Sequence, residues 1–191
     1  MDDTLAPLPP APLPPPVAAQ AAPRRATAAF MLAHPARWIA LGLGSGLSPK
    51  APGTVGTLWG WASFQVLVLF LEPMAIGLLI AASCVVGWWA CTRTAQHLRV
   101  ADPGAIVWDE IVAFWLILWL LNPASLWWQL LAFALFRWLD AAKPGPVAWA
   151  DRLFKDHPNP WARGFGILWD DLVAAGCTLM ILALLVALWG R

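Results

Sequence analysis

Five long apolar runs occupy most of the chain. They cover about residues 55–71, 74–92, 105–121, 124–139 and 167–189. Each run is close to the roughly 17–25 residues that an apolar helix needs to cross a bilayer. Glu72-Pro73 and Asn122-Pro123 interrupt the runs in two places, which predicts two helical hairpins followed by a single long helix. The pattern therefore predicts an all-α, multi-helical integral membrane bundle with about five spans.

The N-terminal segment has a different composition. Residues 1–29 are rich in Ala and Pro, with PLPPAPLPPP at positions 7–16. A segment of this kind has too few large apolar side chains to bury a core, and it favours disordered or polyproline conformations. We therefore expect two regions, a disordered tail at 1–29 and a helical membrane domain at 30–191. The piece Phe30 to Leu41 is expected to form a short interfacial helix.

The overall composition supports a membrane protein and excludes one class of partner. Apolar residues make up 60% of the chain, charged residues only 12%, and the mean hydropathy is +0.65. Soluble domains carry about 25% charged residues. A net charge of +1 without a concentrated basic patch argues against a nucleic-acid partner. The apolar composition makes membrane lipid the expected partner. No oligomeric state follows from the sequence.

Lys and Arg are confined to one set of connections between the apolar runs. The breaks at 72–73 and 122–123 contain neither residue type. Eleven of the twelve basic residues lie before the first run, in the other connections, or at the run ends beside them. With five spans these eleven fall on one side of the membrane, which the positive-inside rule makes the cytoplasmic side.

Two tandem carboxylate pairs mark the starts of the third and fifth runs. Asp109 and Glu110 lie in IVWDEIV, and Asp170 and Asp171 lie in GILWDDLVAAG. Two helices that carry such pairs at equal depth would gather up to four carboxylates, which repel one another unless a cation or protons intervene. Hard oxygen ligands suit Mg²⁺. The alternative is that these acids are interfacial charges paired with Arg137 or Arg163.

A third charged motif, FRWLDAAKPGP, ends the fourth run. Arg137 and Asp140 are spaced i, i+3, which predicts an ion pair on one helical face. Lys143-Pro144 should end the helix, because the residue before proline avoids the helical conformation. Arg137 and Lys143 could then bind phosphate while Asp140 joins the carboxylates. The alternative is a helix end whose long side chains reach back to water.

A Gly-rich segment, GLGSGLSPKAPGTVGTLWG at residues 42–60, precedes and enters the first run. Its glycine spacing fits neither the P-loop nor the dinucleotide fingerprint. Backbone amides in such a turn can form an anion-binding nest. Ser45 and Thr54 would add hydroxyl groups and Lys50 a positive charge.

Taken in order, GSGLSPKAPGTVGTL, DPGAIVWDE, FRWLDAAKPGP and GFGILWDDLVA resemble the motifs of the phosphatidylglycerophosphatase A family. The resemblance covers about residues 38–185. It implies an all-helical, Mg²⁺-dependent enzyme of the bacterial inner membrane. Such an enzyme would remove the terminal phosphate of phosphatidylglycerophosphate, a phospholipid substrate, to give phosphatidylglycerol. Its active site would face the cytoplasm, the side on which the charges place every motif.

The resemblance also implies roles for individual residues. The implied catalytic acids are Asp109, Glu110, Asp140, Asp170 and Asp171, with Asp109, Glu110, Asp170 and Asp171 as metal ligands. The implied substrate-binding residues are Ser45, Lys50, Thr54, Arg137 and Lys143. Two positions depart from the family pattern: Arg163 stands where the first of two glycines is common, and Ala113 stands where glycine is common.

Two other functions remain as alternatives. One is a transporter or channel that uses the carboxylates as a proton or cation relay, which predicts acids spread through the depth of the bilayer. The other is a different phospholipid-head-group enzyme. The acid spacing of the CDP-alcohol phosphatidyltransferases is absent, which disfavours that class.

Overall fold

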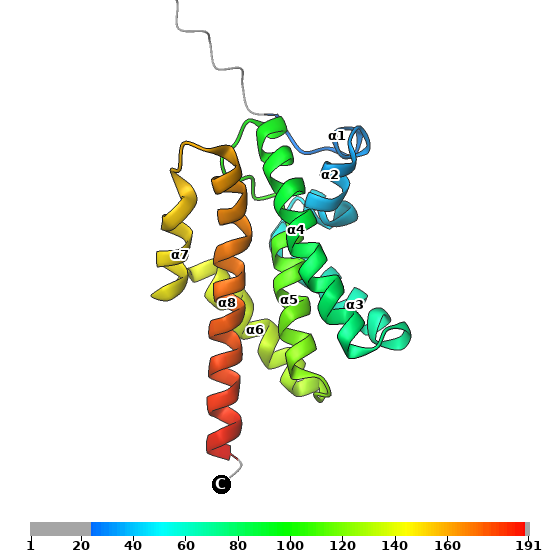
Figure 1. The fold of residues 1–191 in the computed structure, drawn as a ribbon, viewed down its shortest axis with the longest axis vertical. Coiled ribbons are helices and arrows are strands. Elements are labelled where there is room, and N and C mark those ends of the chain that lie inside the picture. Colours follow the sequence, from blue (N-terminus) through cyan, green and yellow to red (C-terminus); the bar gives the residue numbers. More distant parts are fainter. Residues whose placement is uncertain (1–23, 190–191) are drawn as a thin grey trace, which may run out of the picture.

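The computed structural model describes residues 24–189, which form helices and connecting loops with no strand among them. This confirms the all-α prediction. Figure 1 shows the order of the elements along the chain. They are α1 (Ala28–Leu32), α2 (Pro35–Ala40), the 3-10 segment η1 (Gly42–Leu47), α3 (Pro52–Phe70), α4 (Pro73–Leu98), α5 (Trp108–Leu121), α6 (Leu126–Ala142), α7 (Pro146–Lys155) and α8 (Pro160–Trp189).

Proline sets the starts of the main helices. Pro52, Pro73 and Pro146 each stand in the first turn of α3, α4 and α7, and Pro160 begins α8. Proline suits this position because its fixed φ is already helical and its missing N–H would have no helical partner there. Pro73, which ends the first apolar run, therefore also begins the next helix.

Three helices are long and apolar enough to cross a membrane, namely α3, α4 and α8. The five predicted spans are not confirmed, because α5 has only 14 residues and α6 only 17. At 1.5 Å per residue these two helices are about 21 and 26 Å long, below the ~30 Å of a hydrocarbon core. The loops before Trp108 and after Leu121 shorten α5 at both ends.

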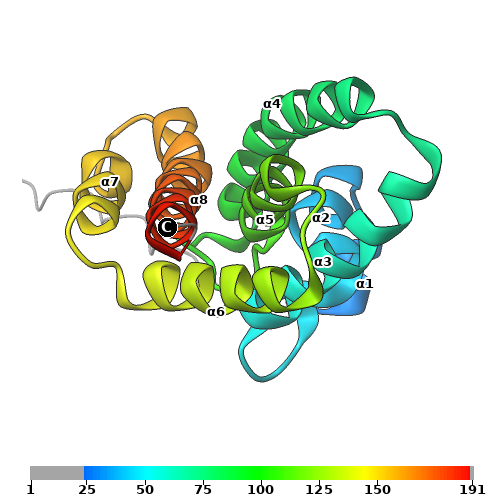
Figure 2. The ribbon, with the colours of Figure 1, turned by 90° about the horizontal axis from the view of Figure 1, so that it is seen from below.

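The short helix α5 lies at the centre of the bundle. Figure 2 shows it between α4, α8, α6 and α3, and most of its residues are buried. A helix that is apolar on all sides is expected in such a position. The indole N–H groups of Trp115 and Trp119 donate hydrogen bonds to the carbonyls of Gly60 (2.9 Å) and Pro73 (2.8 Å). These bonds connect α5 to the start of α4 and to α3.

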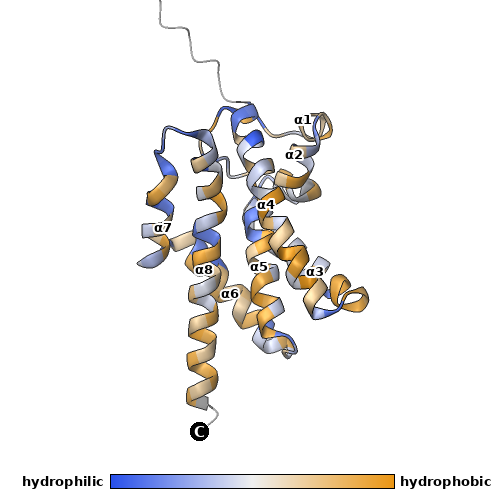
Figure 3. Ribbon diagram, viewed as in Figure 1, coloured by the Kyte–Doolittle hydropathy of each residue, from blue (hydrophilic) through white to orange (hydrophobic). Residues whose placement is uncertain are grey.

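Polar residues gather at one end of the molecule. Figure 3 shows hydrophilic residues at α7, at the end of α4 and along the first half of α8, whereas the second half of α8 is hydrophobic. The helix α7 lies beside that polar half of α8 (Figure 1). The site described below lies where the polar and apolar halves of α8 meet.

The N-terminal predictions are only partly covered by the described residues. Residues 1–23, which make up most of the predicted tail at 1–29, lie outside them. The expected single interfacial helix at Phe30 to Leu41 is instead two short helices, α1 and α2, because His34 caps the start of α2 and Pro35 occupies its first turn.

A close approach between α4 and α8 yields a stability prediction. A Cβ on Gly164 of α8 would lie 2.9 Å from the Cα of Thr92 on α4, whereas a Cβ on Gly176 of the same helix would meet nothing within 4 Å. We expect Gly164→Ala to lower the free energy of unfolding by about 1–3 kcal/mol, the usual cost of overpacking. Thermal unfolding of the purified protein measures this, with Gly176→Ala as the matched control. Equal melting temperatures for the two variants would contradict the packing described here.

Candidate active site

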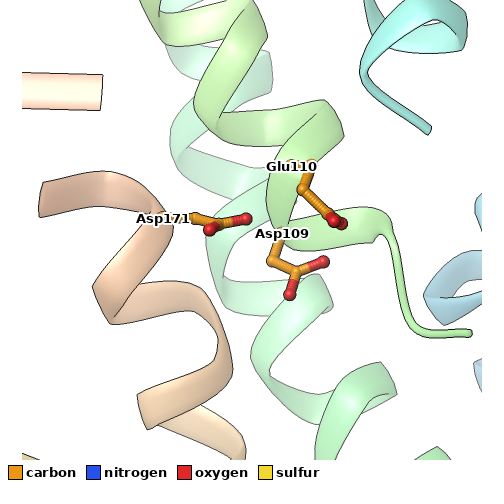
Figure 4. Close-up of side chains that lie close together, drawn as sticks. All are labelled: Asp109, Glu110 and Asp171. Atoms are coloured by element: carbon orange, nitrogen blue, oxygen red, sulfur yellow. The ribbon is translucent and has the colours of Figure 1, made fainter. Parts of the chain in front are cut away.

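Three carboxylates from two helices meet at the polar end of the bundle. Asp109 and Glu110 lie in the first turn of α5, and Asp171 lies on α8. One oxygen of each lies within 4.8 Å of the others. Figure 4 shows Asp171 reaching from α8 toward the start of α5, where the other two side chains lie. The structure thus brings together three of the four predicted metal ligands, and these come from both tandem pairs.

The oxygen atoms of this cluster lack partners. Glu110 and Asp171 are only 9% and 3% exposed. Asp109 Oδ1, Glu110 Oε2 and Asp171 Oδ2 are buried without a hydrogen-bond donor in the described part of the chain. Unpaired buried carboxylate oxygens that lie this close together are strongly unfavourable. The donor set fits a hard divalent cation such as Mg²⁺, which is held by one or a few carboxylates.

The cluster opens into a cavity of about 270 Å³ between α5, α6, α7 and α8. Seven acidic residues line it but only three basic ones, so its wall is strongly negative. The acids are Asp102, Asp109, Glu110, Asp140, Asp151, Asp170 and Asp171, and the bases are Lys143, Lys155 and Arg163. An anionic substrate could enter such a cavity only if cations offset this charge.

Arg137 connects Asp140 to the cluster. Its Nη1 lies 2.6 Å from Asp140 Oδ2, which confirms the ion pair predicted from the i, i+3 spacing. The same nitrogen lies 3.7 Å from Glu110 Oε1 and 3.4 Å from Thr57 Oγ1. A Cβ on Gly53 would overlap Glu110 Oε1 and lie 3.0 Å from Arg137 Nη2. The start of α3 therefore has to be glycine here to let the arginine and the glutamate pack against it.

Lys143 joins α7 to α8. It ends α6 in a left-handed conformation (φ 45°), as the Lys-Pro prediction required, and its Nζ lies 2.5 Å from Asp151 Oδ1 and 2.6 Å from Asp170 Oδ2. Burial alone would lower the pKa of Lys143, but the hydrogen bonds and charges of Asp151 and Asp170 outweigh it and raise that pKa. Burial would likewise raise the pKa of Asp151, and its bonds with Lys143 and Lys155 lower it instead. Lys143 and Asp151 are therefore both charged at neutral pH. Asp170 pairs with Lys143 and is not part of the three-carboxylate cluster.

The Gly-rich segment lies beside the cavity but sends no hydroxyl or ammonium group into it. Ser45 Oγ donates to the Gly42 carbonyl (2.8 Å), and the Lys50 carbonyl accepts from Ser48 Oγ (2.8 Å). Ser45, Lys50 and Thr54 are not among the cavity-lining residues. Their role as substrate-binding residues stays a prediction, and the part of this segment that touches the cluster is Gly53.

Sequence reasoning missed several cavity residues, namely Asp102, Asp151, Lys155 and Arg163. Asp151 and Lys155 lie on α7, a helix that the apolar runs did not predict. Their i, i+4 spacing was a usable signal, and the structure shows the corresponding pair at 3.2 Å. Arg163 stood out only as a possible ion-pair partner of the tandem acids and as a departure from the family pattern.

Comparisons with known proteins agree with the motifs. The family model described as phosphatidylglycerophosphatase A matches residues 38–186. A phosphatidylglycerophosphatase A of Escherichia coli (strain K12) is 37% identical over 75% of this chain and 78% of its own length. The Haemophilus influenzae protein of the same name is 39% identical over 75% of this chain and 84% of its own.

A third relative carries a different name. A protein of Bacteroides thetaiotaomicron, provisionally named a phosphatidylinositol-3-phosphatase, is 34% identical over 79% of this chain and 92% of its own length. No solved structure matches the chain.

The contacts of Lys143 yield a prediction about α7. Asp151→Asn removes the negative charge that accepts hydrogen bonds from Lys143 and Lys155, and a bond of this kind contributes about 1.5–3 kcal/mol. We expect amide protection in α7 to fall by roughly tenfold or more. Hydrogen exchange with mass spectrometry measures this, with Asp156→Asn as the control because Asp156 ends the same helix without an ion pair to any described residue.

The effect should also depend on pH in a defined direction. Because the pKa of Asp151 is lowered in the folded protein, its stabilisation is present above the ordinary carboxyl pKa and is lost as the pH falls through the lowered value. The difference between Asp151→Asn and wild type should therefore shrink in acid. Unchanged protection of α7 at neutral pH would show that Lys143 does not anchor this helix.

Proposed function

Since the chain belongs to the phosphatidylglycerophosphatase A family and is a phosphatase, we propose that it hydrolyses the terminal phosphate monoester of phosphatidylglycerophosphate with Mg²⁺ as cofactor, at the cytoplasmic leaflet of a bacterial inner membrane. The observation that carries the proposal is the group of three carboxylates, from the first turn of α5 and from α8, whose buried oxygens have no hydrogen-bond donor among the described residues. Such a group can hold a cation and, through it, a phosphate.

The metal site would consist of Asp109, Glu110 and Asp171, whose free oxygens converge. A bound Mg²⁺ supplies positive charge that offsets the phosphate and favours ionisation of a bound water. Arg137 holds Glu110 in position as a metal ligand, and its guanidinium also binds Asp140. Arg137 therefore acts as a positioning residue for two acids.

The remaining polar groups have tasks that follow from their positions. In the proposed reaction a water oxygen forms a bond to phosphorus while the bond between phosphorus and the glycerol oxygen breaks. A cavity carboxylate accepts the proton of the water, and the glycerol oxygen takes up a proton as it leaves. Lys143, which lines the cavity and carries a full charge, would stabilise the phosphoryl oxygens during the transfer.

The position of the cluster along α8 suits a lipid substrate. After Asp171 the helix continues through Trp189, 18 residues and about 27 Å, close to the thickness of a hydrocarbon core. The carboxylates therefore lie near the level of lipid head groups. The segregation of Lys and Arg at this same end supports a cytoplasmic orientation.

The arrangement of acids disfavours the transporter alternative. A relay across the membrane needs acids at several depths. Among the described residues the cavity acids gather at one end, and Glu72, in the turn between α3 and α4, is not among the residues that line the cavity. A phosphatase site needs only carboxylates that lie together at one depth, as the cavity acids do.

The direct test is phosphate release from phosphatidylglycerophosphate in mixed micelles by the purified protein. We expect release with Mg²⁺ and none after chelation, with activity restored by added Mg²⁺. Phosphatidylinositol 3-phosphate should be tested in parallel, because one relative carries a name for that activity. Release that persists fully in chelator would refute the metal proposal, and release from the inositol lipid alone would replace the proposed substrate.

The cluster should be tested by single substitutions. We expect Asp109→Asn and Asp171→Asn each to lower kcat/KM by about a hundredfold or more, since loss of even a supporting group at a metal site costs about 10–100-fold. Higher Mg²⁺ should restore part of the activity. Glu72→Gln is the control, because it removes an acid that lies outside the cavity. Full activity of either aspartate variant would refute the proposed site.

A further inference from the structure

A second recess adjoins the acidic cavity. It has a volume of about 320 Å³ and lies between the end of α4 and the start of α8. Ala101 and Arg163 line both hollows, so the two are neighbours. The recess also contains Arg99, Gln96 and Thr92 but no acidic residue. Its wall is therefore positive and rich in donors, the opposite of the cavity beside it.

The two arginines of the recess keep their charge available. Neither Arg99 nor Arg163 forms an ion pair with a carboxylate in the part of the chain that the structure describes. Arg163 is nevertheless held in place, because its Nη1 donates to the carbonyl of His157 at 2.7 Å. A fixed guanidinium with free N–H groups is well suited to bind the oxygens of a phosphate.

The position of the recess along the axis of α8 restricts which phosphate it could bind. Arg163 precedes Asp170 by seven residues on α8, about 10 Å along the helix axis. This displacement is toward the N-terminal end of α8, away from its apolar half. The phosphodiester of a lipid substrate is attached to acyl chains and has to lie on the apolar side of the carboxylates. The anion that suits the recess is therefore the water-soluble one.

We propose that Arg99 and Arg163 form an anion site for the orthophosphate product, which passes from the carboxylate cluster through this recess into water. The inference rests on the proposed function, because that reaction produces orthophosphate in the cavity. A released phosphate dianion would leave a cavity lined mostly by acids, and Arg163 stands on the border between the two hollows. The site gives the product a favourable position outside the cluster and frees the cluster for the next lipid.

Direct binding tests the site without any reaction. Orthophosphate is titrated into the purified wild-type protein in chelator, so that a metal cannot bridge phosphate to the carboxylates, and binding is followed by ³¹P NMR line broadening. We expect wild type to bind, and the double variant Arg99→Gln/Arg163→Gln to bind at least about tenfold more weakly. Arg93→Gln is the matched control, because Arg93 packs over the Trp161 ring and lines neither hollow.

Loss of folding is separated from loss of binding by Arg163→Lys. This variant keeps the charge but not the two-pronged geometry, so it should bind phosphate between wild type and the double variant. Equal binding by wild type and the double variant would overturn the proposal. Because no lipid is present, this result does not depend on whether phosphatidylglycerophosphate is the substrate.

Kinetics then distinguish the product from the lipid as the bound anion. Orthophosphate in the recess obstructs release of the next product and not entry of the lipid, so we expect noncompetitive inhibition. Arg163→Gln should raise this noncompetitive inhibition constant for orthophosphate by about tenfold while the KM for the lipid changes less than about twofold. A parallel rise of both constants would show that Arg163 binds the substrate head group and would overturn the product assignment. An unchanged inhibition constant would do so as well.

Discussion

Repulsion among buried carboxylates is the constraint on which the rest of this structure depends. Asp109, Glu110 and Asp171 bring three oxygens within 4.8 Å of one another in a largely buried position. Nothing in the described protein neutralises all three, since Arg137 reaches only Glu110, and at 3.7 Å. A fold that holds such a group needs stability from elsewhere, and the packing around α5 supplies it. The indole bonds of Trp115 and Trp119 hold the middle and the C-terminal end of that helix, and the close approach at Gly53 packs against Glu110 in its first turn.

The parts that the sequence predicted correctly are those governed by local rules. The tandem acids at the heads of two apolar runs predicted that the pairs would converge, and Asp109 and Asp171 do. The i, i+3 spacing predicted the bond between Arg137 and Asp140, and the Lys-Pro step predicted the end of α6. The ion pair and the helix end depend on a few neighbouring residues and on helix geometry. The convergence of the acids is a tertiary contact, but equal depth on two apolar runs was enough to predict it.

The parts that were missed depend on tertiary contacts. The apolar runs could not show that α5 is too short to span, because its length is set by where the loops before Trp108 and after Leu121 begin. They also gave no sign of α7, which is amphipathic and short and is held in place by the bonds of Asp151 with Lys143. The number of spans does not change the predicted orientation. The loop before α5 and the loop after α6 lie on the same side of the membrane whether or not these two helices cross the bilayer. Eleven of the twelve basic residues therefore share one side in either arrangement.

Charge balance links the two hollows of this molecule. The cavity is lined by seven acids and three bases, so a phosphate alone would meet a repulsive wall, and a bound cation would reduce this repulsion. In the proposed reaction each of the two ligands therefore raises the affinity for the other, as linkage requires. The same attraction opposes departure of the product, because orthophosphate keeps its charge after the lipid has left. A positive recess that shares Arg163 with the cavity offsets this attraction on the aqueous side. In the proposed reaction, opposite charge on adjoining walls would let one end of the bundle bind a phosphate tightly enough to react and still release it.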